Sequence, residues 1–335
     1  MQNTWFQCRP RLALAALPLC LAVQTHAQTF IKVDGSSTVF PITEAVADGF
    51  RSSKGADVRV TIGMAGTGGG FKKFCKGETD ISGASRPILK KEMEECTKNG
   101  IKYMELPVAF DALSVVVSQK NKFLSKITVD ELKKLWEPSA QGVVTRWKQV
   151  NPNWPDVPVK LFGAGSDSGT FDYFTDAIVG KTKSSRSDYV SSEDDNVVVQ
   201  GVARDPNALG YFGYSYFVEN SKRLKVVPVV RQGGQAAVAP SVQTVMDGSY
   251  QPLSRPLFIY LSDKAAARAE VKSFVEYYLT NAANSVKVAG YIPLNAKDYQ
   301  HALTNFAARK TGTAFGGEPE IGVKVSELLR REPKE

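Results

Sequence analysis

Short apolar runs alternate with amphipathic stretches along most of the chain. The apolar runs have the length of buried strands, and the stretches between them place apolar residues at helical spacing. The pattern predicts strands at 30–34, 57–63, 80–84 and 159–163, and helices at 39–53, 69–77, 88–99, 129–136, 170–179, 196–204, 265–279 and 285–289. This alternation predicts an α/β fold with more than one sheet.

Two longer extended runs, 103–118 and 252–261, interrupt this alternation. Both are rich in apolar residues and long enough to pass from one domain into another. Two such crossings predict that the first domain is discontinuous and that the second is inserted into it. We therefore expect two lobes joined by two crossover strands.

Residues 1–27 have the pattern of a cleavable signal peptide rather than of a folded segment. Arg9 and Arg11 precede the apolar stretch 12–23, and residues 25–27 form a small-residue cleavage site. The stretch is too short to span a bilayer, so we expect a mature protein that is soluble outside the cytoplasm. Cys20 offers a lipoprotein alternative, but the bulky leucine before it fits a lipid-attachment site poorly.

Charge and cysteine content narrow the class of protein. Lys and Arg number 42 against 34 Asp and Glu, but the surplus is dispersed, so we expect no nucleic-acid partner. Two of the four cysteines lie in the signal segment, which leaves Cys75 and Cys96. In an oxidising compartment these two are expected to form a disulfide, with two free buried thiols as the alternative.

The chain lacks the residues that most hydrolases and metal sites need. His301 is the single histidine outside the signal segment, and the sequence has no G-x-S-x-G, P-loop or H-E-x-x-H pattern. Ser-His-Asp machinery and most metal sites require imidazole in a defined constellation. We therefore expect a protein that is not an enzyme, with no catalytic residue, no metal and no cofactor.

Three segments rich in Gly, Ser and Thr carry the most information. Residues 34–38, 66–70 and 163–170 each follow a predicted strand and precede a predicted helix. A helix start offers free N–H groups and the positive end of the helix dipole, glycine permits close approach, and hydroxyls add donors. Together they predict a cage for an oxyanion, although each segment alone also reads as ordinary helix capping.

Charged residues near these segments have two interpretations. Arg86 follows the predicted strand 80–84, and its planar fork suits a phosphate-like anion, although a surface ion pair is the alternative. The acidic run 193–195 and the basic pair 72–73 are expected to be solvated faces.

Four segments together resemble the periplasmic phosphate-binding proteins of the PstS family. These are 35–42 (GSSTVFPI), 66–71 (GTGGGF), 80–88 (DISGASRPI) and 167–174 (DSGTFDYF), and the segment 210–214 (GYFGY) fits the same family. The resemblance covers nearly the whole mature chain in the expected order. It implies a periplasmic protein that captures inorganic phosphate between two lobes and delivers it to the membrane permease subunits of an ABC importer.

The resemblance also implies a set of ligand residues. The positions that match the family's phosphate ligands are Ser37, Thr38, Val39, Thr67, Ser168, Gly169 and Thr170. The chain departs from the best-known branch at two positions, since Arg86 stands where that branch has an aspartate and Ala164 where it has an arginine. The sequence therefore resembles a branch with Ser-Arg-Pro and Asp-Ser-Gly-Thr motifs.

Selectivity for phosphate over sulfate requires an acceptor for the proton that only phosphate carries. Asp111, where the first crossing begins, and Asp167, beside Ser168, are the candidates. Each has an alternative role, because Asp111 is also placed to bond hinge backbone and Asp167 to cap the following helix.

The predicted architecture is a type II Venus-flytrap binding protein. Lobe one is expected to comprise residues 28–112 and 258–335, lobe two residues 113–257, and the protein is expected to be a monomer. Competing functions are a binding protein for another oxyanion such as sulfate or molybdate, a secreted phosphatase, and a secreted adhesion protein.

Overall fold

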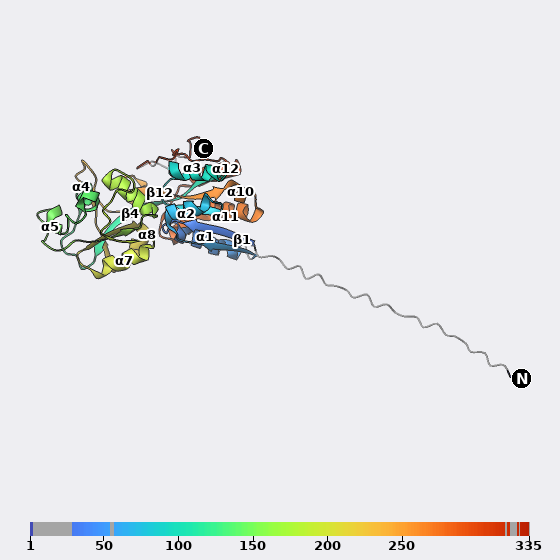
Figure 1. Ribbon diagram of the computed structural model, residues 1–335, viewed down its shortest axis with the longest axis horizontal. Helices are drawn as coiled ribbons and strands as arrows, with labels where there is room; N and C mark the ends of the chain where they lie inside the picture. Colours follow the sequence, from blue (N-terminus) through green and yellow to red (C-terminus); the bar gives the residue numbers. More distant parts are fainter. Residues whose placement is uncertain (3–28, 54–56, 319, 322–326, 328, 335) are drawn as a thin grey trace.

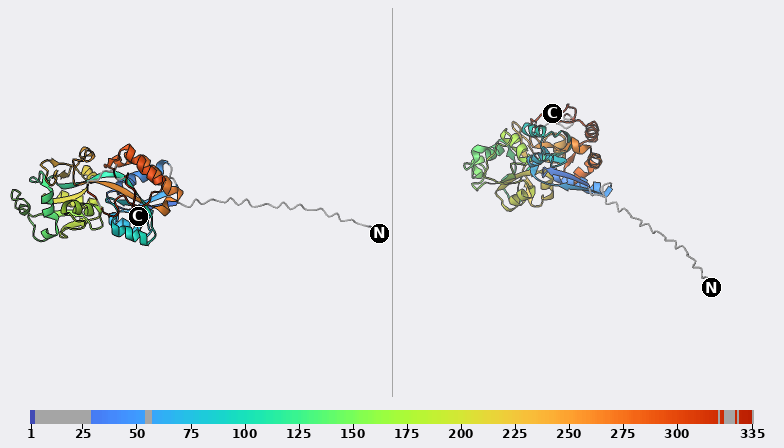
Figure 2. Two further views of the ribbon diagram at one scale, coloured as in Figure 1. Left: turned by 90° about the horizontal axis from the view of Figure 1, so that it is seen from above. Right: turned by 45° about the vertical axis from the view of Figure 1, so that its right-hand side comes forward.

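The computed structural model describes residues 1–2, 29–53, 57–318, 320–321, 327 and 329–334. Two lobes lie side by side in this α/β structure, and the strands β4 (Tyr103–Ser118) and β12 (Ser254–Ser262) run between them (Figures 1 and 2). The two-lobed α/β fold is thereby confirmed. Apart from residues 1–2, the predicted signal peptide, including Cys20 and the cleavage site, lies outside the described residues.

The lobe that carries the first described strand is built from two separate parts of the chain. Its elements are β1 (Thr29–Gly35), α1 (Phe40–Ser53), β2 (Val58–Ile62), α2 (Gly66–Phe74), β3 (Ile81–Ala84), α3 (Lys90–Lys98), α10 (Asp263–Ala266), α11 (Ala269–Val288), β13 (Ile292–Pro293) and α12 (Ala296–Ala307). We call this lobe one. The helices α1 and α11 pack against each other along one side of it.

The other lobe, lobe two, is formed by the chain between the two long strands. Its elements are β5 (Ile127–Thr128), α4 (Val129–Trp136), a 3-10 turn (Pro138–Ala140), α5 (Trp147–Val150), β6 (Lys160–Ala164), α6 (Gly169–Phe174), a π-helical turn (Thr175–Val179), β7 (Val190–Ser192), α7 (Asp195–Arg204), β8 (Ala208–Gly213), α8 (Tyr214–Glu219), β9 (Leu224–Val226), β10 (Val229–Val230), β11 (Ala237–Val238) and α9 (Val242–Met246).

One continuous sheet passes through both lobes. Its strand order is β2-β1-β3-β12-β4-β8-β6-β7, with β9 and β13 also paired to β4, and a small second sheet has the order β11-β10-β5. Strands β1, β2 and β3 are parallel, as are β6, β7 and β8, whereas β4 and β12 are antiparallel to their neighbours. The parallel strands of each lobe therefore end at one edge, where their loops can meet.

Strand β4 changes partner in its middle. Its residues up to Ala112 pair with β12, and Leu113 to Val117 pair with β8. Nearly all of β4 is buried, as expected of a strand covered on both faces. Separate apolar cores on either side of this point give each lobe its own interior.

Two local features bear on the sequence predictions. The disulfide between Cys75 and Cys96 is confirmed, with an S–S distance of 2.03 Å, and it links the end of α2 to α3. The two helices predicted at 265–279 and 285–289 are wrong in detail, because α11 is one continuous helix of 20 residues. Ala282, Ser285 and Val286 lie at the predicted break or just after it, and they are buried. Their packing stabilises the helix through this region.

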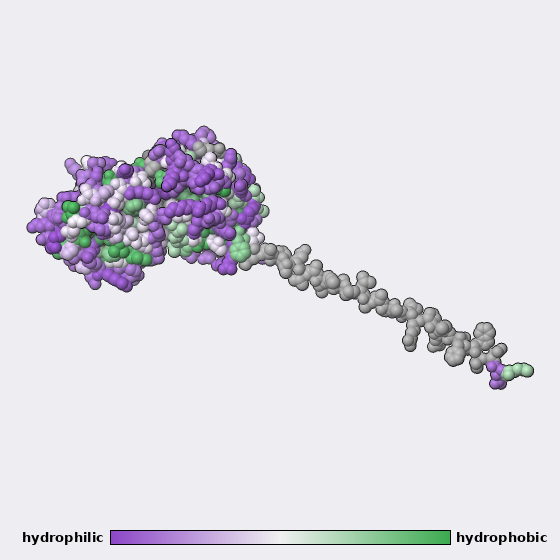
Figure 3. Space-filling view, in the orientation of Figure 1, coloured by the Kyte–Doolittle hydropathy of each residue, from purple (hydrophilic) through white to green (hydrophobic). Residues whose placement is uncertain are grey.

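The molecular surface is polar where the interior is apolar. The face shown in Figure 3 is predominantly hydrophilic, with apolar residues in small separate areas. Among the described residues, no helix combines the length and apolar character needed to cross a membrane.

Candidate functional site

The predicted Gly/Ser/Thr segments lie at strand ends that face one another. Residues 34–38 join β1 to α1, and residues 163–170 join β6 to α6. Segment 66–70 differs from the prediction, because it forms the first turns of α2 instead of preceding the helix. At α6, the Ser168 side chain accepts a hydrogen bond from the backbone N–H of Thr170 at 3.1 Å and so caps the helix.

Hydroxyl groups from the two lobes meet in a buried position. Thr38 Oγ1 lies 3.3 Å from Thr170 Oγ1, and both residues are fully buried. Thr67 Oγ1 lies 3.1 Å from Ser85 Oγ and accepts the Ser85 N–H at 3.1 Å. Gly169 packs closely against this group, since a Cβ at this position would lie 2.4 Å from Thr67 Oγ1. The structure thus brings together predicted ligand residues that are far apart in the sequence.

Arg255 joins these hydroxyls and was not predicted from the sequence. Its Nη2 donates to Thr170 Oγ1 at 2.8 Å and to Thr38 Oγ1 at 3.3 Å, while Nη1 donates to the Gly169 carbonyl at 3.0 Å. The residue is 1% exposed. A signal was present, because Arg255 is the single charged residue in the apolar run 252–261. We call Thr38, Thr67, Ser85, Gly169, Thr170 and Arg255 the interlobe cluster.

Asp111 fixes the guanidinium of Arg255. Its Oδ2 accepts from Arg255 Nη2 at 3.0 Å and from Nε at 3.2 Å, and its Oδ1 accepts the Tyr214 N–H at 3.1 Å. Burial raises the pKa of Asp111, and the Arg255 charge opposes part of that rise. Both oxygens of this predicted proton acceptor therefore already receive hydrogen bonds from the protein.

Arg86 is also buried, but its guanidinium is held by carboxylates. Nε donates to Asp172 Oδ2 at 2.6 Å, and Nη1 and Nη2 donate to the two oxygens of Glu92 at 2.8 and 2.7 Å. Because Asp172 lies in α6 of lobe two, this ion pair joins the lobes. Arg86 therefore forms a contact between the lobes, and its three guanidinium nitrogens already donate to carboxylates.

Asp167 lies at the outer side of the same interface. Lys72 Nζ donates to both of its carboxylate oxygens at 2.8 Å, and the Gly68 N–H donates to its carbonyl at 2.8 Å. Its side chain is 37% exposed and that of Lys72 is 67% exposed. Lys72, predicted as part of a solvated face, thus also contributes a contact between the lobes.

The remaining predicted ligand residues border the interlobe cluster through their backbone. The Tyr216 hydroxyl donates to the Ser37 carbonyl at 3.2 Å, and the Val39 N–H donates to the Ser36 carbonyl at 3.1 Å. Ser37 and Val39 are both buried.

The structure corrects the expectation that the acidic run 193–195 is a solvated face. Asp195 is only 1% exposed and begins α7. Glu193 Oε1 accepts the Asp167 N–H at 3.0 Å, so the run lies directly beside the loop that leads into α6. Sequence patterning missed this burial because charged runs are usually exposed.

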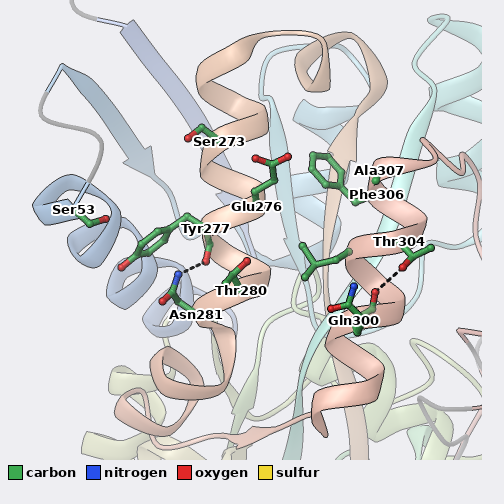
Figure 4. Close-up of a pocket in the computed structure, with 11 residues that line it drawn as sticks. Ser53, Ser273, Glu276, Tyr277, Thr280, Asn281, Gln300, Thr304, Phe306 and Ala307 are labelled. Carbon is green, nitrogen blue, oxygen red and sulfur yellow. Dashed lines mark hydrogen bonds between the residues drawn. The ribbon is translucent and has the colours of Figure 1, made fainter.

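A separate surface pocket lies between α11 and α12 (Figure 4). Its lining includes Glu276, Tyr277, Asn281 and Gln300, and it shares no residue with the interlobe cluster. The residues drawn there come from lobe one alone, and we assign the pocket no function.

The fold and the interlobe cluster together define the class of the protein. Two lobes that meet at a buried polar cluster are typical of a periplasmic-type binding protein.

Comparisons with known proteins agree with this class. A family model described as a PBP superfamily domain matches residues 22–282. Protein SphX of Synechococcus elongatus is 48% identical over 323 residues, covering 96% of this chain and 95% of the relative. The phosphate-binding protein PstS of Staphylococcus saprophyticus is 37% identical over 270 residues, covering 80% of this chain and 82% of the relative.

A solved structure extends the comparison to three dimensions. A Clostridium perfringens protein, assigned to phosphate ABC transport and solved with bound phosphate, is 26% identical, has a TM-score of 0.66, and covers 80% of this chain and 100% of its own. The chain belongs to the PBP superfamily and, within it, to the PstS family of phosphate-binding proteins. It is accordingly a binding protein and not an enzyme.

Proposed function

We propose that this chain binds inorganic phosphate between its lobes and delivers it to the permease subunits of an ABC importer. The observation that carries the proposal is the buried convergence of Arg255 with hydroxyl groups from both lobes. A guanidinium that lies beside hydroxyl donors suits an oxyanion, since charge-assisted bonds are about twice as strong as neutral ones. The names of the relatives and the bound phosphate in the Clostridium protein support phosphate as that anion.

The interlobe cluster suggests how the anion is held. Arg255 would supply the positive charge, and the hydroxyls of Thr38, Thr67 and Thr170 would donate to phosphate oxygens in place of their present mutual bonds. Ser37, Val39, Ser168 and Gly169 remain predicted ligands beside them. Direct contact of Arg86 with the anion also stays a prediction, and its bonds to Asp172 and Glu92 favour a role in holding the lobes together.

Binding would be coupled to closure about the two long strands. We place the hinge at the predicted boundaries 112/113 and 257/258, the first of which coincides with the change of partner in β4. Contacts between the lobes, such as Arg86–Asp172 and Lys72–Asp167, form only when the lobes are together. They therefore favour the closed form, which a ligand touching both lobes stabilises further.

Isothermal titration calorimetry of the ligand-stripped protein tests the proposed ligand. We expect saturable, tight binding of phosphate that an excess of sulfate or molybdate does not abolish. Preferred binding of sulfate or molybdate would instead identify a different oxyanion protein. No heat with any of the three anions would overturn the proposal.

Partners and location follow from the same proposal. We infer a monomer that is exported to the periplasm after cleavage behind residue 27. N-terminal sequencing of the periplasmic protein should begin at Gln28, and its mass by light scattering should be that of one chain. Phosphate uptake by cells should fall when the gene is deleted and return with the wild-type chain.

A further inference from the structure

Helix α8 of lobe two lies in close contact with lobe one. The helix follows Gly213, the last residue of β8 and part of the segment 210–214 (GYFGY). A Cβ at Gly213 would lie 3.3 Å from Thr38 Cγ2 and 3.2 Å from the Tyr291 hydroxyl oxygen, both in lobe one. Glycine at this position therefore allows the start of α8 to approach the loop that carries Thr38.

Tyr216 adds a hydrogen bond between the lobes at the same place. Its hydroxyl donates to the Ser37 carbonyl at 3.2 Å, and its ring belongs to a buried apolar cluster of lobe two that includes Val198 and Phe212. Burial raises the pKa of Tyr216, so the hydroxyl keeps its proton and remains a donor. A side chain fixed in lobe two thus holds a backbone carbonyl of lobe one.

The carbonyl that Tyr216 holds belongs to the peptide group beside the interlobe cluster. The peptide bond between Ser37 and Thr38 is trans, so its C=O and N–H point in opposite directions within one plane. The Thr38 N–H donates to Ser36 Oγ at 3.2 Å, and Thr38 Oγ1 lies 3.3 Å from Arg255 Nη2. The orientation of this peptide therefore determines where the donors of Thr38 point.

We propose that Tyr216 is a positioning residue, which fixes the Ser37–Thr38 peptide when the lobes close and so slows release of the bound anion. This inference rests on the proposed phosphate-binding function. The hydroxyl and the carbonyl belong to different lobes, so their bond exists only when the lobes are together. With the lobes apart, water can bond to both groups. The bond therefore stabilises the closed form and leaves the first encounter with the anion unchanged.

The test compares Tyr216→Phe with its matched control Tyr299→Phe. Each change removes one hydroxyl that donates to a backbone carbonyl, since the Tyr299 hydroxyl donates to the Val108 carbonyl at 2.8 Å. That second bond joins α12 of lobe one to the part of β4 that pairs with β12, so closure does not alter it. Calorimetry gives the Kd for inorganic phosphate, and release of labelled phosphate into excess unlabelled phosphate gives the dissociation rate.

For Tyr216→Phe we expect the Kd to rise roughly tenfold, because the closed form then buries the Ser37 carbonyl without this donor. The rise should come from faster release, with the association rate within about twofold of wild type. For Tyr299→Phe we expect the Kd and both rates to stay within about twofold of wild type, because its bond is the same in both forms.

Thermal unfolding supplies a readout that separates the two variants. Tyr299→Phe should lower the Tm by a similar amount with and without phosphate, because the lost bond is present in both states. Tyr216→Phe should lower the Tm mainly when phosphate is bound, because phosphate favours the form in which its bond exists. Equal lowering of the Tm in both conditions by Tyr216→Phe would contradict the inference.

Gly213→Ala tests the same contact by a steric change. Gly213 has a φ of −63°, which any residue adopts, so the variant should fold. The added methyl group would crowd Thr38 and Tyr291 in the closed form alone, and we expect phosphate to be released roughly fivefold faster or more. Release at the wild-type rate would show that α8 does not approach lobe one in the bound form.

The proposed function and the role of Tyr216 fail in different ways. Wild-type protein that binds no phosphate overturns the proposed function. Wild-type protein that binds phosphate, together with a Tyr216→Phe variant of unchanged Kd, overturns the role of Tyr216 alone. A Kd raised only by slower association would also overturn it, because the hydroxyl would then act before closure.

Discussion

Arg255 and Arg86 are both buried arginines that bridge the two lobes, but they bond to different kinds of partner. Arg255 has one carboxylate partner, Asp111, and otherwise donates to two threonine hydroxyls and a carbonyl. Arg86 has two carboxylate partners, Asp172 and Glu92, which occupy Nε, Nη1 and Nη2. Hydroxyls can turn to a new acceptor, whereas a carboxylate cannot leave a buried guanidinium without a large cost.

This difference is the basis of our proposal that Arg255 binds the anion and that Arg86 holds the lobes together. An incoming anion can replace the weak mutual contact of Thr38 and Thr170 and gain the donors of Arg255. An anion at Arg86 would have to displace Glu92 or Asp172 from charge-assisted bonds of 2.6 to 2.8 Å. The bonds that the two side chains already make therefore favour Arg255 over Arg86 as the partner of the anion, and direct contact of Arg86 with the anion stays a prediction.

Removal of Arg255 should have the largest effect on phosphate binding. Arg255→Met is best made together with Asp111→Asn, so that no buried carboxylate is left unpaired. We expect phosphate affinity to fall about 100-fold or more, since each lost bond to a charged group is worth about 1.5–3 kcal/mol. Calorimetric titration measures the change.

Asp111→Asn alone is the control for this variant. It retains the guanidinium and its bonds to Thr38 and Thr170, so its affinity should remain much closer to wild type than that of the double variant. If the double variant binds phosphate within about threefold of wild type, the change in affinity is smaller than the loss of one hydrogen bond would cause. That result would show that Arg255 does not bind the anion.

Arg86 should have a smaller effect that acts through Asp172. Arg86→Met leaves Asp172 buried without its guanidinium, and we expect phosphate affinity to fall about tenfold because closure becomes less favourable. Adding Asp172→Asn removes the unpaired charge and should restore most of the loss. Wild type, the two single variants and the double variant form a double-mutant cycle that calorimetry can complete.

The cycle distinguishes the two interpretations of Arg86. If Arg86 donated to the anion itself, Asp172→Asn would not restore binding, and the double variant would remain as weak as Arg86→Met. Recovery in the double variant would instead assign Arg86 to lobe closure.

The sequence was sufficient for features that depend on local chemistry. Ser168 and the residues after it were recognisable because N-cap hydroxyls, glycine and a following helix are adjacent in the chain. The pairing of Cys75 with Cys96 followed from the compartment and from elimination of the other two cysteines. The two crossover strands could be predicted from the runs 103–118 and 252–261, because apolar runs of this length are unusual within one small domain.

Other features depend on contacts that no local pattern reveals. Arg255 lies 217 residues from Thr38 and 85 from Thr170, so its place between them follows only from the pairing of β12 with β4. Asp195 sits in an acidic run, and its burial follows from where α7 begins rather than from composition. The break predicted between residues 279 and 285 is absent from α11, because Ala282 and Val286 pack in the core of lobe one.

Lys72 should have the smallest effect, because its ion pair with Asp167 is exposed to solvent. The side chains are 67% and 37% exposed, and pairs of this kind contribute about 0–1 kcal/mol. We therefore expect Lys72→Ala to weaken phosphate binding by about threefold at most, and the difference from wild type should vanish in high salt because screening removes it. Lys76→Ala, which removes the same charge four residues along, controls for the general loss of positive charge. A deficit near tenfold that persisted in high salt would mean that the outer contacts hold the closed form as firmly as the buried pair of Arg86 and Asp172, and the contrast between buried and exposed bridges would fail.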